Sequence, residues 1–315
     1  MTDRPDQPTA SPDTKAKKPA GKEPIDGAGW RPYPATMLGP ESGTLVREHR
    51  SGGDTLVRLD NIYKSFGTLR VLNGVSLEIK RGQTTVIIGP SGTGKSVLIK
   101  LIVGLLKPDR GGIYYDEKCV NTMSPAGLVE VRKEIGFLFQ MSALFDSMDV
   151  GQNVEFPLVE HTEMTEAERD ERVDRVLRMV GLSGLQRKWP GSMSGGQQKR
   201  VALARAIVLE PSLVMYDEPT TGLDPIRADL INELIIALNT KFGITSIVVT
   251  HDMASAAKIA DRMLLLYDGN IICDGDPETF LRSENPLVQR FIQGQADAIE
   301  LESIQQGLGT IITDG

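Results

Sequence analysis

The segment that constrains this chain most is a glycine-rich run in its first third. The run reads Gly89-Pro90-Ser91-Gly92-Thr93-Gly94-Lys95-Ser96 and fits the pattern G-x-x-x-x-G-K-[ST]. The β-branched residues 84–88 before it predict a buried strand, and the apolar residues 97–106 after it predict a helix that ends ahead of Pro108. In this context glycine N–H groups approach phosphate oxygens, the lysine reaches the outer phosphates and the last hydroxyl binds magnesium. The run therefore predicts a cradle for nucleotide phosphates.

Acidic side chains follow a second apolar strand. Residues 213–218, with the sequence Leu-Val-Met-Tyr-Asp-Glu, predict a strand that ends in two carboxylates. Adjacent residues at a strand end point in different directions, so we expect Asp217 beside a magnesium ion and Glu218 beside the terminal phosphate. Two more polar side chains, Gln140 and His251, follow predicted strands at the edge of the sheet where ligands bind.

A second glycine-rich segment also precedes a helix. Ser194-Gly195-Gly196-Gln197 leads into the helix-forming residues 201–208, which predicts another anion-binding helix start. Two such cradles in one chain require an explanation. Phe66, next to Gly67 at a predicted loop tip, is a ring that can lie flat against a purine.

Composition narrows the class of protein. The 315 residues suffice for one large domain but not for a tandem pair of nucleotide-binding domains, and the net charge of -7 disfavours nucleic acid as the main partner. Cys119 and Cys273 have no metal-ligand neighbours in sequence and fit a reduced intracellular protein. The apolar runs are too short to span a bilayer, so we expect a cytosolic protein unless a partner holds it at a membrane.

Both ends of the chain differ in composition from the middle. Residues 1–53 carry eight of the 18 prolines and little apolar periodicity, which predicts a disordered amino-terminal arm. Within the arm, Trp30-Arg31-Pro32-Tyr33 is an aromatic island that either docks or stays idle. From residue 293 the sequence is polar, and Leu301, Ile304 and Leu308 form a weak helical stripe.

Apolar spacing predicts the remaining elements. Residues 56–59 and 71–79 alternate as strands of a small antiparallel layer, and residues 166–180 form a charged amphipathic helix. Residues 263–273 predict a hairpin. Met141, Leu144, Phe145 and Met148 recur at helical spacing, and this face seats either a partner's helix or the protein's own helical subdomain.

In their order along the chain, these motifs resemble those of the ATP-binding subunit of ABC transporters, over residues 55–278. The resemblance implies an α/β fold, with a RecA-like P-loop NTPase core, an antiparallel β subdomain and an inserted helical subdomain at about residues 141–205. The ABC domain then covers residues 54–292, and residues 293–315 form a tail. In this family two subunits associate head to tail, and each ATP lies between the phosphate loop of one and the SGGQ motif of the other. The two cradles then complete each other's sites.

The resemblance also implies a role for each motif residue. Phe66 stacks on adenine, Glu218 positions or deprotonates the attacking water, and His251 contacts the terminal phosphate. The catalytic set is Glu218, His251, Gln140 and Lys95, and the magnesium ligands are Ser96, Gln140 and Asp217. The remaining nucleotide contacts come from the phosphate loop with the residue after it, and from the SGGQ motif across the dimer: Gly89, Pro90, Ser91, Gly92, Thr93, Gly94, Lys95, Ser96 and Val97; Ser194, Gly195, Gly196 and Gln197. Asp224 links the two sites, and Met193 replaces the usual leucine with a residue of similar size.

Within the family, residues 139–145, residues 285–294 and Glu160-His161-Thr162 are similar to the Mkl/MlaF-type ATPases of Mce-family lipid transporters. Val159 departs from that group, which usually has arginine there. The likeness implies a homodimer bound to MlaE/YrbE-like permease subunits and Mce lipid-binding proteins, with no nucleic acid. The cargo is then a phospholipid, fatty acid or sterol, and the site of action is the cytoplasmic face of the bacterial inner membrane. His161 is a candidate for the permease contact.

Two alternatives stay open from the sequence. One is a soluble ABC ATPase that acts on ribosomes or DNA, although such proteins usually carry tandem cassettes, long insertions or zinc motifs. The other keeps the transport function and changes the cargo to amino acids, metals or drugs. Only residues 141–162 speak against this second alternative.

Overall fold

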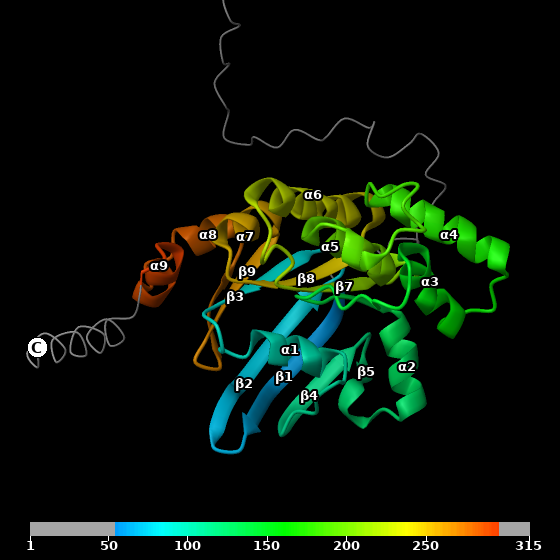
Figure 1. Ribbon diagram of the computed structural model, residues 1–315. Coiled ribbons are helices and arrows are strands. Elements are labelled where there is room, and N and C mark those ends of the chain that lie inside the picture. Colours follow the sequence, from blue (N-terminus) through cyan, green and yellow to red (C-terminus); the bar gives the residue numbers. More distant parts are fainter. Residues whose placement is uncertain (1–53, 296–315) are drawn as a thin grey trace, which may run out of the picture.

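The computed structural model describes residues 54–295, which form two sheets with helices packed around them (Figure 1). The first sheet is antiparallel, in the order β2-β1-β4-β5. Its strands are β1 (Thr55–Phe66), β2 (Leu69–Lys80), β4 (Arg110–Tyr115) and β5 (Lys118–Cys119). The long hairpin of β1 and β2 confirms the antiparallel layer that the alternating residues predict.

The second sheet has six strands in the order β10-β9-β3-β8-β7-β6, and all its pairings are parallel except that of β10 with β9. The strands are β3 (Thr84–Ile88), β6 (Ile135–Leu138), β7 (Leu213–Asp217), β8 (Thr245–Thr250), β9 (Arg262–Tyr267) and β10 (Asn270–Gly275). β3, β7 and β8 are buried at every position, as expected for a parallel sheet that is covered on both faces.

Alternate side chains of these central strands enter two different cores. Val86 and Ile88 of β3 join the core that contains α3 to α7, whereas Ile87 joins the core that contains α1 and the antiparallel sheet. Val214 and Met215 of β7 divide in the same way, since successive strand residues point to opposite faces. Figure 1 shows α1 and the antiparallel sheet on one side of the parallel sheet, and α5 and α6 on the other.

The helices are α1 (Lys95–Ile102), α2 (Pro125–Lys133), α3 (Val150–His161), α4 (Glu166–Met179), α5 (Gly195–Ile207), α6 (Pro225–Phe242), α7 (Met253–Ile259), α8 (Pro277–Leu281) and α9 (Pro286–Ile292). Short 3-10 turns occur at Val120–Thr122 and Pro190–Ser192. α3, α4 and α5 each start with a capping box, in which the cap side chain and the third helical residue satisfy each other's backbone N–H groups. The buried stripe of α4, Val173, Val176 and Leu177, confirms the predicted amphipathic helix.

One predicted helix is absent, and another is present but ends earlier than predicted. The segment with Met141, Leu144, Phe145 and Met148 is a loop, because Ser142 and Ala143 adopt left-handed backbone conformations with φ of 61° and 47° that end any helix. The predicted apolar face therefore does not exist as a helix face. The helix after the phosphate loop ends at Ile102 rather than 106, since Gly104 turns the chain with a φ of 68°.

The predicted arm at residues 1–53, with its Trp30 island, and the stripe of Leu301, Ile304 and Leu308 lie outside the described residues. The division into an ABC domain at residues 54–292 and a helical subdomain stays a prediction. Within residues 54–295, none of the helices has the length and apolar character that a bilayer crossing needs.

Candidate functional site

The phosphate loop joins the end of β3 to the start of α1, and two of its glycines have no room for a side chain. A Cβ at Gly89, whose φ is 156°, would lie 2.2 Å from the carbonyl oxygen of Leu266. Gly94 is the left-handed residue that caps α1, and its Cβ would lie 2.8 Å from the Val71 side chain. Both positions require glycine, and the backbone between them is left free to face a ligand.

Lys95, the first residue of α1, lies folded over this loop. Its side chain is buried, and its Nζ donates hydrogen bonds to the carbonyl oxygens of Gly89 at 2.7 Å and Pro90 at 2.8 Å. Burial lowers the pKa of Lys95, while the nearby Glu218 and Asp217 act in the opposite direction. The loop therefore contains a buried cation whose ammonium group is hydrogen-bonded to two carbonyl oxygens of the same loop.

The rest of the loop is open. Ser91 and Gly92 are exposed, and the Thr93 hydroxyl donates to the Pro90 carbonyl at 2.9 Å. Val97 is half-buried and packs on the α1 side of the sheet. The exposed residues are thus reachable by a ligand, whereas Val97 mainly anchors the helix.

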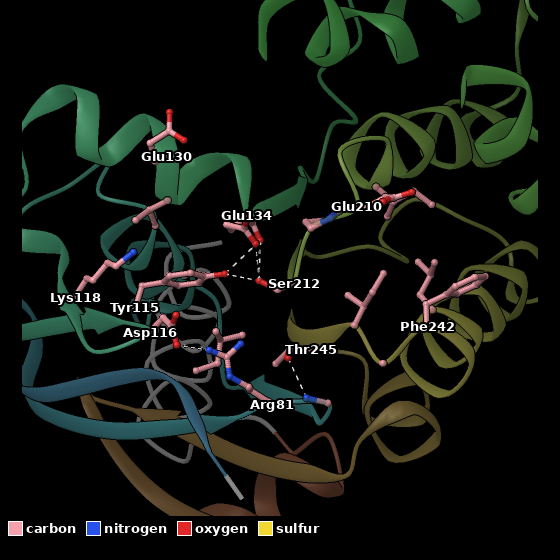
Figure 2. A pocket seen from close by; sticks show the side chains of 18 of the residues that line it. Arg81, Tyr115, Asp116, Lys118, Glu130, Glu134, Glu210, Ser212, Phe242 and Thr245 are labelled. Carbon is pink, nitrogen blue, oxygen red and sulfur yellow. Dashed lines mark hydrogen bonds and ion pairs between the residues drawn. The ribbon is translucent and has the colours of Figure 1, made fainter. Parts of the chain in front are cut away.

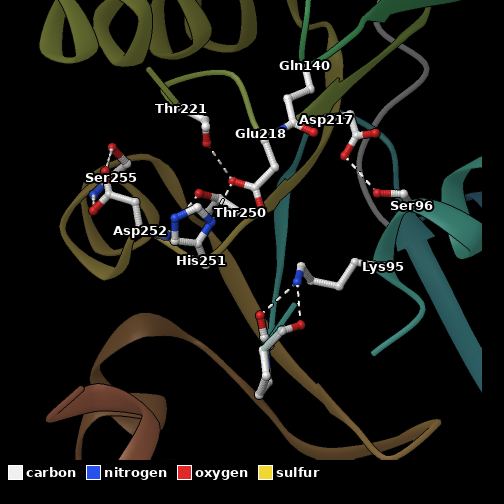
Figure 3. A network of polar contacts seen from close by, with 12 residues as sticks. Lys95, Ser96, Gln140, Asp217, Glu218, Thr221, Thr250, His251, Asp252 and Ser255 are labelled. Carbon is white, nitrogen blue, oxygen red and sulfur yellow. Dashed lines mark hydrogen bonds and ion pairs between the residues drawn. The ribbon is translucent and has the colours of Figure 1, made fainter. Parts of the chain in front are cut away.

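Ser96 and Asp217 come together across the loop and the end of β7 (Figure 3). The Ser96 hydroxyl donates to Asp217 Oδ1 at 3.0 Å. Burial raises the pKa of Asp217, and the hydrogen bond from Ser96 works against this rise. A hydroxyl, a carboxylate and the amide oxygen of Gln140 are all hard oxygen donors of the kind that magnesium prefers, so these residues fit that ion. The side chain of Gln140 is exposed, on the loop that follows β6.

Glu218 and His251 form a pair at the carboxyl ends of β7 and β8. His251 Nδ1 lies 2.8 Å from Glu218 Oε2, and the Thr221 hydroxyl donates to the same oxygen at 3.0 Å. Glu218 is a non-glycine residue with a φ of 51°, and its backbone N–H donates to the Val249 carbonyl at 2.8 Å. This turn directs the carboxylate away from Asp217 and toward the histidine, as Figure 3 shows.

Sequence reasoning missed two residues of this network. Thr221 holds the Glu218 carboxylate, and the only signal for it is a hydroxyl three residues after an acid. Lys199 of α5 is buried and donates to the carbonyl oxygens of Gln140 at 3.0 Å and Glu218 at 3.1 Å. A lysine on a largely buried helix is the only local sign of this role, and it does not identify the two acceptors.

The SGGQ segment starts α5 on the other side of the parallel sheet. Ser194 is the cap, and its hydroxyl accepts from the N–H of Gln197, whose Oε1 accepts from the N–H of Ser194. A Cβ at Gly195 would have no neighbour closer than 3.9 Å, whereas one at Gly196 would press on Arg227 at 3.1 Å. Because α1 and α5 belong to different cores, the chain does not bring its two cradles together.

Phe66 lies at the end of β1, where the hairpin turns. The residue is 48% exposed, and the Lys64 Nζ lies 5.4 Å from the ring centroid. The ring is therefore available for a flat contact with another aromatic group.

A cavity of about 930 Å³ opens at the other end of the parallel strands (Figure 2). The Tyr115 hydroxyl lies 2.7 Å from Ser212 Oγ there, and burial raises the pKa of Tyr115 to about 12. Ser212 and Thr245 stand at the amino ends of β7 and β8, opposite the phosphate loop. This cavity therefore takes no part in the site above.

Comparison with known proteins identifies the family. The ABC transporter family model matches residues 72–221. The intermembrane phospholipid transport system ATP-binding protein MlaF of Escherichia coli K12 is 40% identical over 242 residues, which cover 77% of this chain and 90% of MlaF. The chain belongs to the ABC transporter family. It is an ATPase of that family, as the motifs predict.

Two more relatives and a solved structure support this assignment. The probable ribonucleotide transport ATP-binding protein mkl of Mycobacterium leprae is 41% identical over 76% of this chain and 69% of its own length. The chloroplastic protein TRIGALACTOSYLDIACYLGLYCEROL 3 of Arabidopsis thaliana is 40% identical over 82% and 80%. The ATP-binding cassette MJ0796, solved as a dimer bound to ADP and Pi, has a TM-score of 0.66 and 35% identity over 70% of this chain and 98% of that one. The predicted fold class and the binding of a nucleotide are confirmed.

Proposed function

We propose that this ABC ATPase energises a membrane transporter of lipids. The observation that carries the proposal is identity of 40% over most of the chain with MlaF, named for phospholipid transport, and with a plant protein named after a galactolipid. The mycobacterial relatives, which are equally similar, are named for ribonucleotide transport. A nucleotide cargo is therefore the second candidate, and the experiment below distinguishes the two.

In the proposed site, the chain binds ATP and magnesium at the carboxyl edge of the parallel sheet. Phe66 stacks on adenine, and residues 89–97 bind the phosphates through backbone N–H groups and Lys95. Ser96, Asp217 and Gln140 hold magnesium, which draws charge from the phosphates when it is bound. The 3.0 Å contact between Ser96 and Asp217 supports this set, because it places two of the three oxygens together.

Glu218 is the proposed residue for the attacking water. The contacts of its Oε2 with His251 and Thr221 leave Oε1 to accept a proton from water or to orient it. His251, whose side chain is 56% exposed, then meets the terminal phosphate from the solvent side. The arrangement places an oriented base, Glu218, near the phosphate loop with its buried Lys95. Phosphoryl transfer to water requires such an oriented base and positive charge near the phosphates.

The active unit is proposed to be a homodimer. Ser194 to Gln197 form a complete, capped helix start that lies across the sheet from the phosphate loop of the same chain. A second copy turned head to tail supplies this segment to the nucleotide, as the dimeric form of the related cassette MJ0796 suggests. The proposed partners of the homodimer are permease subunits of the MlaE/YrbE type and Mce lipid-binding proteins. The proposed place of action is the cytoplasmic face of the inner membrane.

The test is a pull-down of tagged Glu218→Gln protein, with ATP present, from detergent-solubilised native membranes. Proteins and lipids are then identified by mass spectrometry, with the Ser194→Arg variant as a matched control that binds ATP without closing the dimer. Recovery of a multi-span permease with Mce proteins and enriched lipid supports the proposal. Recovery of a permease with bound ribonucleotides other than the added ATP, and with no lipid, favours the second candidate. Recovery of ribosomal or DNA-repair proteins without a membrane subunit overturns transport.

A further inference from the structure

Lys199 is a buried cation that no carboxylate within residues 54–295 contacts directly. It lies on α5, five residues after the cap Ser194, and it is 5% exposed. Among the described residues, no ion pair includes it. Burial lowers the pKa of Lys199, and only the more distant charges of Glu218 and Asp217 oppose that effect. Burying an ammonium group costs desolvation free energy. We therefore expect its hydrogen bonds to fix groups that a neutral side chain would leave unfixed.

The two carbonyl groups that Lys199 holds belong to site residues. Its Nζ donates to Gln140 at 3.0 Å and to Glu218 at 3.1 Å, so a single ammonium group joins the loop after β6 to the end of β7. Glu218 has the left-handed φ of 51°, which is an unfavourable conformation for a residue with a side chain. Its N–H donates to the Val249 carbonyl at 2.8 Å. Its carbonyl accepts from Lys199 Nζ at 3.1 Å and, less closely, from the Thr221 N–H at 3.3 Å, so both sides of this strained residue are held.

We propose that Lys199 is a positioning residue for ATP hydrolysis. It fixes the backbones of Gln140 and Glu218 relative to α5, the helix that begins with the SGGQ segment. The inference rests on the proposed role of Glu218 in activating water. Without the ammonium group, the Glu218 carbonyl keeps only the longer contact with the Thr221 N–H at 3.3 Å, and the carboxylate then leaves its position opposite His251.

The same helix provides a matched control. Arg205, six residues further along α5, donates to the carbonyls of Ser142 at 2.9 Å and Ala143 at 2.8 Å. It fixes the loop that follows Gln140 but has no contact with Glu218 among those that the structure records. Replacing Arg205 therefore loosens the loop without releasing the acid.

The experiment measures steady-state ATP hydrolysis, ATP binding and thermal unfolding for Lys199→Met, Lys199→Gln and Arg205→Met. For Lys199→Met we expect kcat to fall about tenfold or more, since charge-assisted bonds to two backbone carbonyls are lost, with KM and ATP affinity within about twofold of the parent. Lys199→Gln, whose amide can still donate to one carbonyl, lies between Lys199→Met and the parent. Arg205→Met keeps kcat within about threefold.

A double variant separates positioning from a general structural role. If Lys199 acts through Glu218, Lys199→Met adds no further loss in a Glu218→Gln background, measured by single turnover. Multiplying losses would overturn the proposal, and so would a parent-like kcat in both Lys199 variants while Glu218→Gln is inactive. A fall of ATP affinity parallel to kcat in Lys199→Gln would show a structural role only. Normal hydrolysis by Glu218→Gln alone would instead remove the proposed role of Glu218, and with it the basis of this inference.

Discussion

The two glycine-rich helix starts of this protein differ in what surrounds them. The phosphate loop lies against the parallel sheet, its lysine is folded onto its own carbonyls, and Ser96 contacts a carboxylate at the end of β7. The SGGQ start is self-contained: its capping box satisfies its own N–H groups, and Gly195 faces open space. The phosphate loop thus has charged and polar side chains packed around it. The SGGQ start has only its own capping contacts and an exposed glycine.

In the proposed dimer, this difference means that one chain carries both halves of a site without assembling them. The acids, the histidine and the proposed magnesium ligands all gather on the side of the phosphate loop. Within residues 54–295, none of the recorded side-chain contacts joins Ser194 to that group. The comparison therefore predicts that damage to the first cradle affects binding, chemistry and stability, whereas damage to the second affects only steps that need another molecule.

The largest effect is expected from Glu218→Gln. The amide keeps the size of the side chain but cannot accept a proton, so turnover should fall about a thousandfold while ATP affinity stays within a few-fold of the parent. Phosphate release and equilibrium binding of a fluorescent ATP analogue check the two halves of this prediction. Hydrolysis at the normal rate would refute the role given to Glu218.

Ser194→Arg tests the second cradle. A long cation at the cap position blocks an approaching nucleotide, so hydrolysis should fall about a hundredfold, while ATP binding to the isolated subunit is unchanged. The same two assays apply. Unchanged hydrolysis would mean that the SGGQ segment is not part of the site.

Lys95→Met tests the phosphate loop, and here the expected effect is on ATP binding itself. Removing the buried cation takes charge-assisted bonds from the phosphates, so ATP affinity itself should fall about tenfold. Titration with the fluorescent analogue measures this directly, and Lys100→Met on the exposed side of α1 is the control. Equal affinity in the Lys95 and Lys100 variants would contradict the proposed phosphate contact.

The smallest effect comes from a pair of matched glycine substitutions. Gly89→Ala forces a methyl group to within 2.2 Å of a backbone carbonyl, and strain of roughly 2 kcal/mol should lower Tm by about 5 °C. Gly195→Ala meets nothing within 3.9 Å and should leave Tm within about 1 °C. Thermal melts of the isolated subunit check both values, and equal shifts would show that the two cradles are alike in packing.

The sequence predicted the parts of the fold that depend on local patterns. The buried runs of β3, β7 and β8 and the stripe of α4 follow from residue type and spacing alone. The prediction of a helix at Met141 is wrong because the helical spacing of its apolar residues is coincidental. Ser142 and Ala143 instead adopt left-handed conformations, and their carbonyls accept from Arg205. Turns of that kind depend on a partner 63 residues away and leave no local signal.

The site divides in the same way. Motif spacing predicted that the phosphate loop, Asp217, Glu218 and His251 follow strands at one edge of the sheet, and they do, because the carboxyl ends of adjacent parallel strands lie together. Lys199 could not be found, since its two acceptors are backbone carbonyls 59 and 19 residues away in sequence. Backbone acceptors are present at every residue, so only the folded chain shows which ones a buried lysine selects.

The most direct test of the central claim is the mass of the Glu218→Gln protein in solution, measured by sedimentation with and without saturating ATP. The Glu218→Gln/Ser194→Arg double variant is measured beside it. A site shared between two copies predicts a dimer in ATP for the first protein and a monomer for the double variant. A monomer in both cases, or a dimer that Ser194→Arg leaves intact, would contradict the claim that each SGGQ cradle completes the partner's phosphate loop.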